Sequence, residues 1–138
     1  MRKLKKNKNI YITERDFERI DWMLSGAADY PNIERLRKEL DRATLVRSED
    51  IPSDVVTMNS RVIFKELDSG VESEITLVYP SDANLEQGKV SVLAPVGSAL
   101  LGLSRGDEIQ WPLPSGKIST YKIVRVLFQP EAAGQYDL

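Results

Sequence analysis

The sequence of 138 residues contains no cysteine and no histidine. Without cysteine, disulfide bonds cannot form, and without either residue the common zinc ligand sets are missing. Nucleophilic mechanisms that depend on a cysteine thiolate or on a histidine base are excluded for the same reason. The composition therefore removes most classes of enzyme, and we expect a protein with no catalytic residues and no cofactor.

The sequence also lacks a run of about 18 apolar residues, which a membrane-spanning helix would need. The N-terminus passes from basic residues through Ile10, Tyr11 and Ile12 into further charged residues, so a secretory segment is not expected either. Hydrophobic residues make up 41% of the chain and charged residues 29%, which is typical of a soluble protein with a packed core. We expect a cytoplasmic monomer that does not bind membranes.

Positive charge is scarce outside the first eight residues. Those eight residues contain the basic side chains Arg2, Lys3, Lys5, Lys6 and Lys8. The rest of the chain has 14 basic and 21 acidic side chains, a net charge of -7, although the whole chain has only -2. A nucleic-acid-binding domain needs a basic face, so the acidic body argues against one. Residues 1–9 are expected to be a flexible tail, with weak contact to RNA or DNA as the alternative.

Two short helices are predicted near the N-terminus. Thr13 is expected to cap the first helix, which ends at Ser25 and Gly26. Its apolar side chains recur at helical spacing: Phe17, Ile20 and Leu24. A second helix is predicted over residues 31–43, where a proline occupies the first turn and apolar residues follow at spacings of three and four.

The apolar stripes of both helices are narrow. Narrow stripes joined by a short loop favour an antiparallel hairpin, a short coiled coil over residues 10–44. The alternative is a helical pair that lies flat on the domain that follows. Trp22 and Met23 flank the first stripe, and if they are exposed they form an apolar patch that invites association.

The pattern changes after a connector at residues 45–54. Strands are predicted at residues 61–67 and 71–79, and the Asp68-Ser69-Gly70 loop between them indicates a hairpin. Further strands are predicted at residues 89–93, 107–111 and 118–127, with a short helical turn at residues 98–101. A helical pair followed by a run of strands predicts an α+β fold whose second unit, residues 55–138, is an antiparallel sheet domain with a short helix.

Residues 94–107 read Ala-Pro-Val-Gly-Ser-Ala-Leu-Leu-Gly-Leu-Ser-Arg-Gly-Asp. This segment resembles the C-terminal signature of Gre transcription factors, in which a strand ends at the proline and a short helix packs on the sheet. Segments 39–43, 54–62, 77–80 and 129–134 resemble the Rnk family, named regulator of nucleoside diphosphate kinase, more than the transcript-cleaving members. The resemblance extends from about residue 10 to the C-terminus and implies an FKBP-like sheet domain.

Gre-type proteins place this domain at the rim of the secondary channel of RNA polymerase and insert the helical hairpin. Transcript cleavage needs acidic residues at the hairpin tip, because carboxylates help to hold a metal ion and to position water. Here the tip contains Asp29, but the position three residues later is the uncharged Asn32. Each predicted helix is only roughly 16 to 20 Å long. The resemblance therefore implies a regulator that binds polymerase, competes with longer Gre-type factors and modulates elongation without cleaving RNA.

Contact with polymerase is predicted at two places. The expected contact residues are Pro95, Val96, Gly97 and Ser98 on the sheet domain, and Asp29 and Tyr30 at the hairpin tip. Each group has a structural alternative. The first group would maintain the fold, Asp29 would cap the second helix or remain a solvated acid, and Tyr30 would fix the loop.

Two rival functions stay open. The name of the resembled family suggests direct regulation of nucleoside diphosphate kinase, although altered transcription would produce the same effect indirectly. The FKBP-like fold suggests a prolyl isomerase, but such enzymes need an open pocket lined by aromatic residues. The aromatic residues of this domain suit core or surface positions instead: Phe64, Tyr79, Trp111, Tyr121 and Phe128. Acidic pairs such as Asp107 and Glu108 are interpreted as turn charges, so no metal site is predicted.

Overall fold

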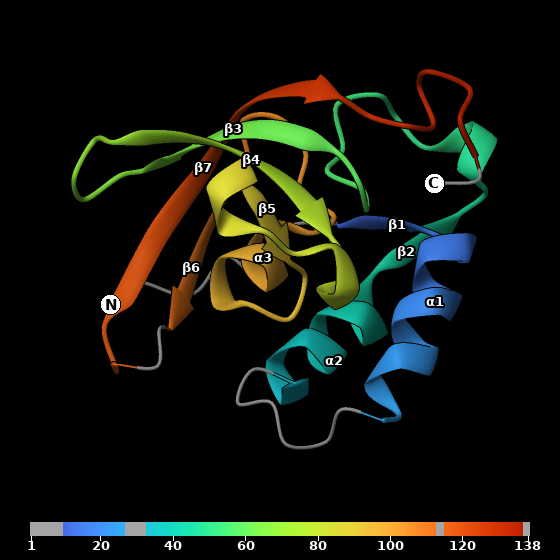
Figure 1. The fold of residues 1–138 in the computed structure, drawn as a ribbon, viewed down its shortest axis with the longest axis horizontal. Helices are drawn as coiled ribbons and strands as arrows, with labels where there is room; N and C mark the ends of the chain where they lie inside the picture. The colour runs from blue at the N-terminus through green and yellow to red at the C-terminus, as the bar shows by residue number, and fades with distance from the viewer. Residues whose placement is uncertain (1–9, 27–32, 113–114, 137–138) are drawn as a thin grey trace.

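The computed structural model describes residues 10–26, 33–112 and 115–136. The helices are α1 (Glu14–Leu24), α2 (Ile33–Arg42) and α3 (Pro95–Leu100). The strands are β1 (Tyr11–Thr13), β2 (Thr44–Val46), β3 (Arg61–Glu66), β4 (Glu72–Val78), β5 (Lys89–Ser91), β6 (Glu108–Pro112) and β7 (Ile118–Phe128). Figure 1 shows α1 and α2 at one side of the molecule and the larger sheet with α3 at the other. The predicted α+β class is confirmed.

The first helix begins and ends where the sequence predicts. The Asp16 N–H donates to Thr13 Oγ1 at 3.0 Å, so the hydroxyl satisfies one of the free donors of the first turn. The helix ends at Ser25, whose N–H donates to the Asp21 carbonyl at 3.3 Å. Ile20 and Leu24 are buried, as their spacing requires.

A two-stranded parallel pair, β1 with β2, joins the outer ends of the two helices. Thr13 pairs with Val46, and the Thr44 N–H donates to the Ile10 carbonyl at 2.9 Å. The sequence does not predict this pair, and the assignment of residues 45–54 to an irregular connector is wrong for Leu45 and Val46. Three-residue strands are too short to show an alternating pattern.

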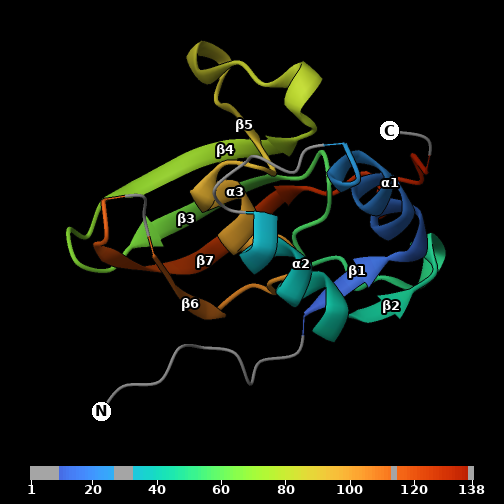
Figure 2. The ribbon, with the colours of Figure 1, turned by 90° about the horizontal axis from the view of Figure 1, so that it is seen from below.

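The larger sheet has the order β5-β4-β3-β7-β6. The predicted hairpin is confirmed, since β3 pairs antiparallel with β4, and β7 pairs antiparallel with both β3 and β6. The expectation of a wholly antiparallel sheet is wrong at one edge, because β5 runs parallel to β4. The chain between them passes through 3-10 turns at Pro80–Asp82 and Leu85–Gln87, which form the protrusion in Figure 2. This connection is long enough to bring the chain back in the same direction.

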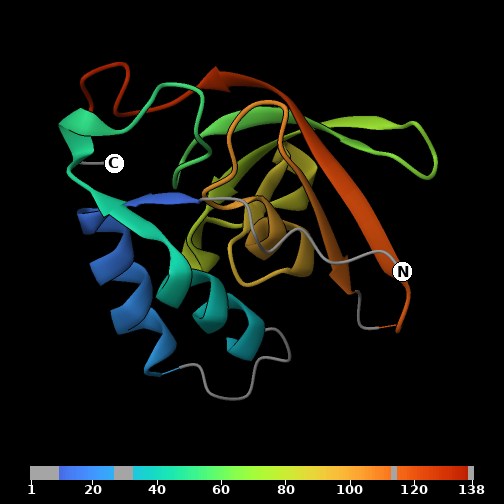
Figure 3. The same cartoon turned by 180° about the vertical axis from the view of Figure 1, so that it is seen from behind.

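The helical pair shares its core with the sheet domain. Ile20, Leu24 and Leu36 belong to the same buried cluster as Met58 and Leu77. Figure 3 shows α1 and α2 running in opposite directions beside the sheet domain. The prediction of a separate coiled coil is therefore wrong for the described residues, and the alternative of helices packed on the sheet domain is the observed arrangement. None of the described helices is long and apolar enough to cross a bilayer.

Candidate functional site

The signature segment 94–107 is built into the fold at α3. Gly97 has no room for a side chain, because a Cβ atom there would lie 2.1 Å from the Ser91 carbonyl oxygen. The neighbouring Ser98 is buried and donates its Oγ hydrogen to the Val92 carbonyl at 2.6 Å. Pro95 occupies the first helical turn, where its missing N–H leaves no bond unmade. These contacts hold α3 against the end of β5.

The second signature glycine, Gly102, joins this segment to the N-terminal strand. Its φ of 83° lies in the left-handed region, and a Cβ atom there would meet the Ile10 Cβ at 3.0 Å. The Tyr11 N–H also donates to the Gly102 carbonyl at 3.2 Å. Gly102 is thus a point of contact between the sheet domain and β1.

The predicted contact residues differ in what they expose. Gly97 and Ser98 are buried and are used by the fold, whereas Pro95 and Val96 are half-buried. Asp29 and Tyr30 lie outside the described residues, as do the basic residues Arg2, Lys3, Lys5, Lys6 and Lys8. A partner contact at this end of the sheet domain stays a prediction for Pro95 and Val96.

Asp16 is a buried acid that sequence reasoning missed. From the sequence alone, an acid in the first turn of a helix only suits the positive end of the helix dipole. In the structure its side chain crosses to the sheet domain, where Asp16 Oδ2 accepts a hydrogen bond from the Met58 N–H at 3.1 Å. Asp16 thereby ties the first turn of α1 to the segment that precedes β3.

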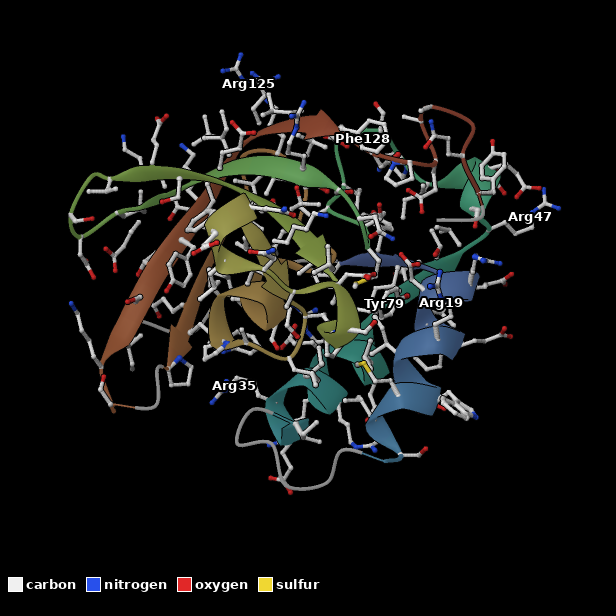
Figure 4. The ribbon with its side chains drawn as sticks, viewed as in Figure 1. Arg19, Arg35, Arg47, Tyr79, Arg125 and Phe128 are labelled. Carbon is white, nitrogen blue, oxygen red and sulfur yellow. The ribbon has the colours of Figure 1, made fainter. Side chains whose placement is uncertain are left out.

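Arg19 and Tyr79 lie beside Asp16. The Arg19 guanidinium carbon lies 4.4 Å from the centre of the Tyr79 ring, a cation–π distance. Figure 4 shows the two side chains meeting, Arg19 from α1 and Tyr79 from the chain just after β4. Tyr79 comes from one of the segments that resemble the Rnk family.

Two more of those segments meet here. Thr57 Oγ1 donates to Glu131 Oε1 at 2.7 Å, which links segment 54–62 to segment 129–134. Gln129 Nε2 donates to the carbonyls of Pro52 and Val55 at 2.8 and 2.9 Å. Three stretches far apart in the sequence therefore converge on the first helix. We call the group Asp16, Arg19, Met58, Tyr79 and Glu131 the Asp16 cluster.

The Asp16 cluster has unusual protonation properties. Burial raises the pKa of Asp16 from its usual value near 3.8 to about 6, and the nearby Glu131 carboxylate adds to the increase. The Met58 hydrogen bond and the Arg19 charge lower that pKa and limit the increase. Burial, and then the Asp16 charge, raise the pKa of the Tyr79 hydroxyl well above its usual range. Both shifts follow from desolvation of the charged form.

The comparisons with known proteins divide the chain in the same way as the fold. Residues 51–128 match the family described as transcription elongation factor GreA/GreB, C-terminal. Residues 8–46 match the Rnk N-terminus. The regulator of nucleoside diphosphate kinase of Escherichia coli is 47% identical over 131 residues, which covers 94% of this chain and 96% of that protein. The chain belongs to the Rnk family.

Gre factors are related over a smaller share of their length. The transcription elongation factor GreA of Syntrophomonas wolfei is 41% identical over 91 residues, 66% of this chain and 57% of that protein. A solved structure described as prokaryotic transcription elongation factor GreA/GreB from Nitrosomonas europaea is 46% identical. It superposes with a TM-score of 0.72 over 88% of this chain and all of that one. The match to the GreA/GreB C-terminal family lies over the sheet domain, whereas the solved structure from Nitrosomonas europaea corresponds to most of this chain.

The described side chains are arranged in ways that hold elements of the fold in place. No group of three or more Asp, Glu, His or Cys side chains within the described ranges is arranged to hold a metal ion. Phe64, Trp111 and Tyr121 are buried, and Phe64 packs edge-on against Tyr121 with ring centres 5.5 Å apart. These strand aromatics have the core roles that the sequence favours. The Asp16 cluster links α1 to the sheet domain and so fixes how the surfaces of these two parts lie relative to each other.

Proposed function

We propose that this protein binds RNA polymerase near the secondary channel through its sheet domain and modulates elongation without cleaving the transcript. The membership of the Rnk family and the GreA/GreB-type C-terminal domain support this function. In this proposal the protein competes with longer Gre-type factors, because their binding sites on polymerase overlap.

The observation that carries the proposal is the length and packing of the helical pair. The two helices have 11 and 10 residues, which gives about 15 to 17 Å at about 1.5 Å per residue. Their apolar faces are buried in the core of the sheet domain. A pair held in this way has little reach toward a distant catalytic centre, and its linker contains a single acid, Asp29.

Pro95 and Val96 are the proposed contact residues on the sheet domain, with Asp29 and Tyr30 as further candidates on the linker. The buried neighbours of the first pair hold α3 rigidly, since Gly97 fits against Ser91 and Ser98 is bonded to Val92. A rigid surface loses little conformational entropy on binding. Pro95 and Val96 are partly exposed and their buried neighbours are tightly packed, so this surface is suitable for a protein contact.

A transcription assay on backtracked elongation complexes tests the proposal. This protein alone should stimulate no cleavage, and it should reduce the cleavage stimulated by GreA as its concentration rises. Val96→Arg should weaken this competition by about tenfold, because a charge would replace an apolar contact. Leu85→Ala, at an exposed site outside α3, is the control and should compete normally. Robust cleavage by the protein alone would contradict the proposal.

A second candidate function rests on the name of the Escherichia coli relative, regulator of nucleoside diphosphate kinase. In that case the protein would bind the kinase directly. Purified kinase mixed with this protein should then form a complex and change its activity in the absence of polymerase. A complex with polymerase and none with the kinase would assign any effect on the kinase to transcription.

A further inference from the structure

Two lysines face each other on the outer face of the larger sheet. Lys65 of β3 and Lys122 of β7 are direct partners in the antiparallel register. Their neighbours Phe64 and Tyr121 belong to the buried core, so the alternation along each strand directs both lysines to the opposite face. Figure 1 shows α2 and α3 together on one side of β3 and β7. Like charges placed directly opposite each other destabilise a sheet, so this pair does not serve the stability of the fold.

A hollow of about 420 Å³ opens over this lysine pair. Its charged lining consists of three bases and one acid, Lys65, Arg105, Lys122 and Glu72, and we call it the Lys65 hollow. Leu67 and Val124 add apolar surface to the lining. A hollow of this size that combines apolar surface with a few charged groups has room for a small ligand.

The positive charge of the Lys65 hollow is not neutralised by ion pairs. Its three bases form none of the ion pairs found among the described residues. Glu72 lies opposite Lys65 in the register of the sheet. Glu108 lies opposite Lys122 but does not line the hollow. The Asp107 carboxylate accepts a backbone N–H within its own turn. Three positive charges and one negative charge leave the hollow at +2, although the chain beyond its first eight residues has a net charge of -7.

We infer that the Lys65 hollow binds the phosphate group of a small molecule. A phosphate group carries about 1.5 to 2 negative charges near neutral pH, which matches the charge of the hollow, whereas a carboxylate carries only one. The phosphate would lie between Lys65 and Lys122 and replace their repulsion by attraction, and Arg105 would donate to its oxygens. The hollow and the proposed polymerase contact use different residues, so this inference does not rest on the proposed function.

Amide signals of the full-length protein labelled with nitrogen-15 provide the test. The Gly106 N–H is the reporter, because Gly106 lines the hollow and its N–H is held by the Ile123 carbonyl at 2.8 Å. The indole signal of the buried Trp111 monitors the fold. The probes are inorganic phosphate and phenyl phosphate, titrated at constant ionic strength in potassium chloride. Benzoate is the control, because it presents the same ring with a single negative charge.

Both phosphates should shift the Gly106 signal until it saturates and leave Trp111 unchanged, while benzoate should bind at least about fivefold more weakly than phenyl phosphate. Lys65→Gln and Lys122→Gln should each weaken phosphate binding about fivefold, because each removes one of the facing charges. Glu72→Gln should strengthen it about threefold. Lys38→Gln removes an exposed base from α2 and is the matched control, so its affinity should stay within about twofold of that of the original protein.

Tighter binding of phenyl phosphate than of inorganic phosphate would support the inference with a phosphate ester as the ligand, and equal binding would support it with free phosphate. Three outcomes would overturn it. The first is a Gly106 shift that grows without saturation, since no site would then exist. The second is equal weakening by Lys38→Gln and Lys122→Gln, because the protein would then respond only to its net charge. The third is benzoate binding as tight as that of phenyl phosphate, because the ring and not the phosphate would then be bound.

Discussion

The helical pair and the sheet domain are held together by different means. In the sheet domain, β3 lies between β4 and β7 and is hydrogen-bonded along both edges. Among the described residues, the helical pair is joined by the short β1–β2 pairing between its outer ends and by an ion pair, Arg37 with Asp21 at 4.0 Å, between α1 and α2. Helices of 10 or 11 residues are marginal in isolation.

The difference indicates which region positions the other. Leu24 and Leu36 are buried in the core of the sheet domain, and Asp16 and Arg19 reach onto its surface. The helical pair therefore depends on the sheet domain for its core and for its orientation. A longer hairpin would have a seam of its own, whereas this one moves only if the shared core opens.

The largest expected effect comes from removing part of that shared core. Leu24→Ala should lower the free energy of unfolding by about 3 to 4 kcal/mol, because the buried side chain leaves a cavity. Urea unfolding followed by far-ultraviolet circular dichroism and by Trp111 fluorescence, with Trp22 replaced by phenylalanine in both proteins, should show one shared transition. Trp22→Ala, on the exposed face of the same helix, should change stability by less than about 0.5 kcal/mol.

If the helical signal were lost at a lower urea concentration than the Trp111 signal, the helical pair and the sheet domain would unfold separately. The helical pair would then be an independent unit, and the dependence described above would be wrong.

A smaller effect is expected at the buried acid that fixes α1. The pKa of Asp16 is about 6 in the folded protein and near 3.8 when unfolded, so between these values the unfolded chain gives up its proton first. The original protein therefore loses stability as the pH rises through this window. Asp16→Asn cannot ionise, and its amide oxygen can still accept from Met58. The free energy of unfolding of the variant, relative to that of the unmodified protein, should therefore increase by about 2 to 3 kcal/mol as the pH rises from 4 to 7.5.

Urea midpoints measured across this pH range check the expectation. Asp21→Asn is the matched control, because Asp21 is an exposed acid on the same helix. It should change stability by less than about 0.5 kcal/mol at either pH. A stability difference for Asp16→Asn that does not vary with pH would show that Asp16 does not hold its proton more tightly in the folded state.

The sequence could predict the features that depend on neighbouring residues. Thr13 as a helix cap and the β3–β4 hairpin around Gly70 were both predicted, because each is encoded within a few positions. A role for Gly97 in maintaining the fold is one of the two alternatives that the sequence leaves open, although the sequence could not show that Ser91 is the neighbour. Local chemistry and a specific signature were sufficient for most of the fold.

Features that depend on distant residues could not be predicted. The β1–β2 pair joins segments more than 30 residues apart, and each strand is too short to show a period. Asp16 resembles an ordinary dipole acid, and only its contact with Met58, 42 positions away, makes it a buried site. The chain between β4 and β5 is long, so the sequence does not show that β5 runs parallel to β4. In each case the deciding partner lies outside the local sequence window.

The smallest expected effect compares how α1 and α2 are fixed to the sheet domain. Arg19 lies 4.4 Å from the Tyr79 ring centre and Arg35 lies 5.4 Å from the Trp111 ring centre, so each helix has one cation–π contact. Arg19→Met and Arg35→Met should each cost about 0.5 to 1 kcal/mol in urea unfolding at pH 7.5. Only Arg19 also lowers the pKa of Asp16, so only its removal should raise that pKa further. Carbon-13 titration of the Asp16 carboxyl group separates the two variants. An equal titration midpoint in both variants would mean that the Arg19 charge does not act on Asp16, and that the two helices are attached in the same way.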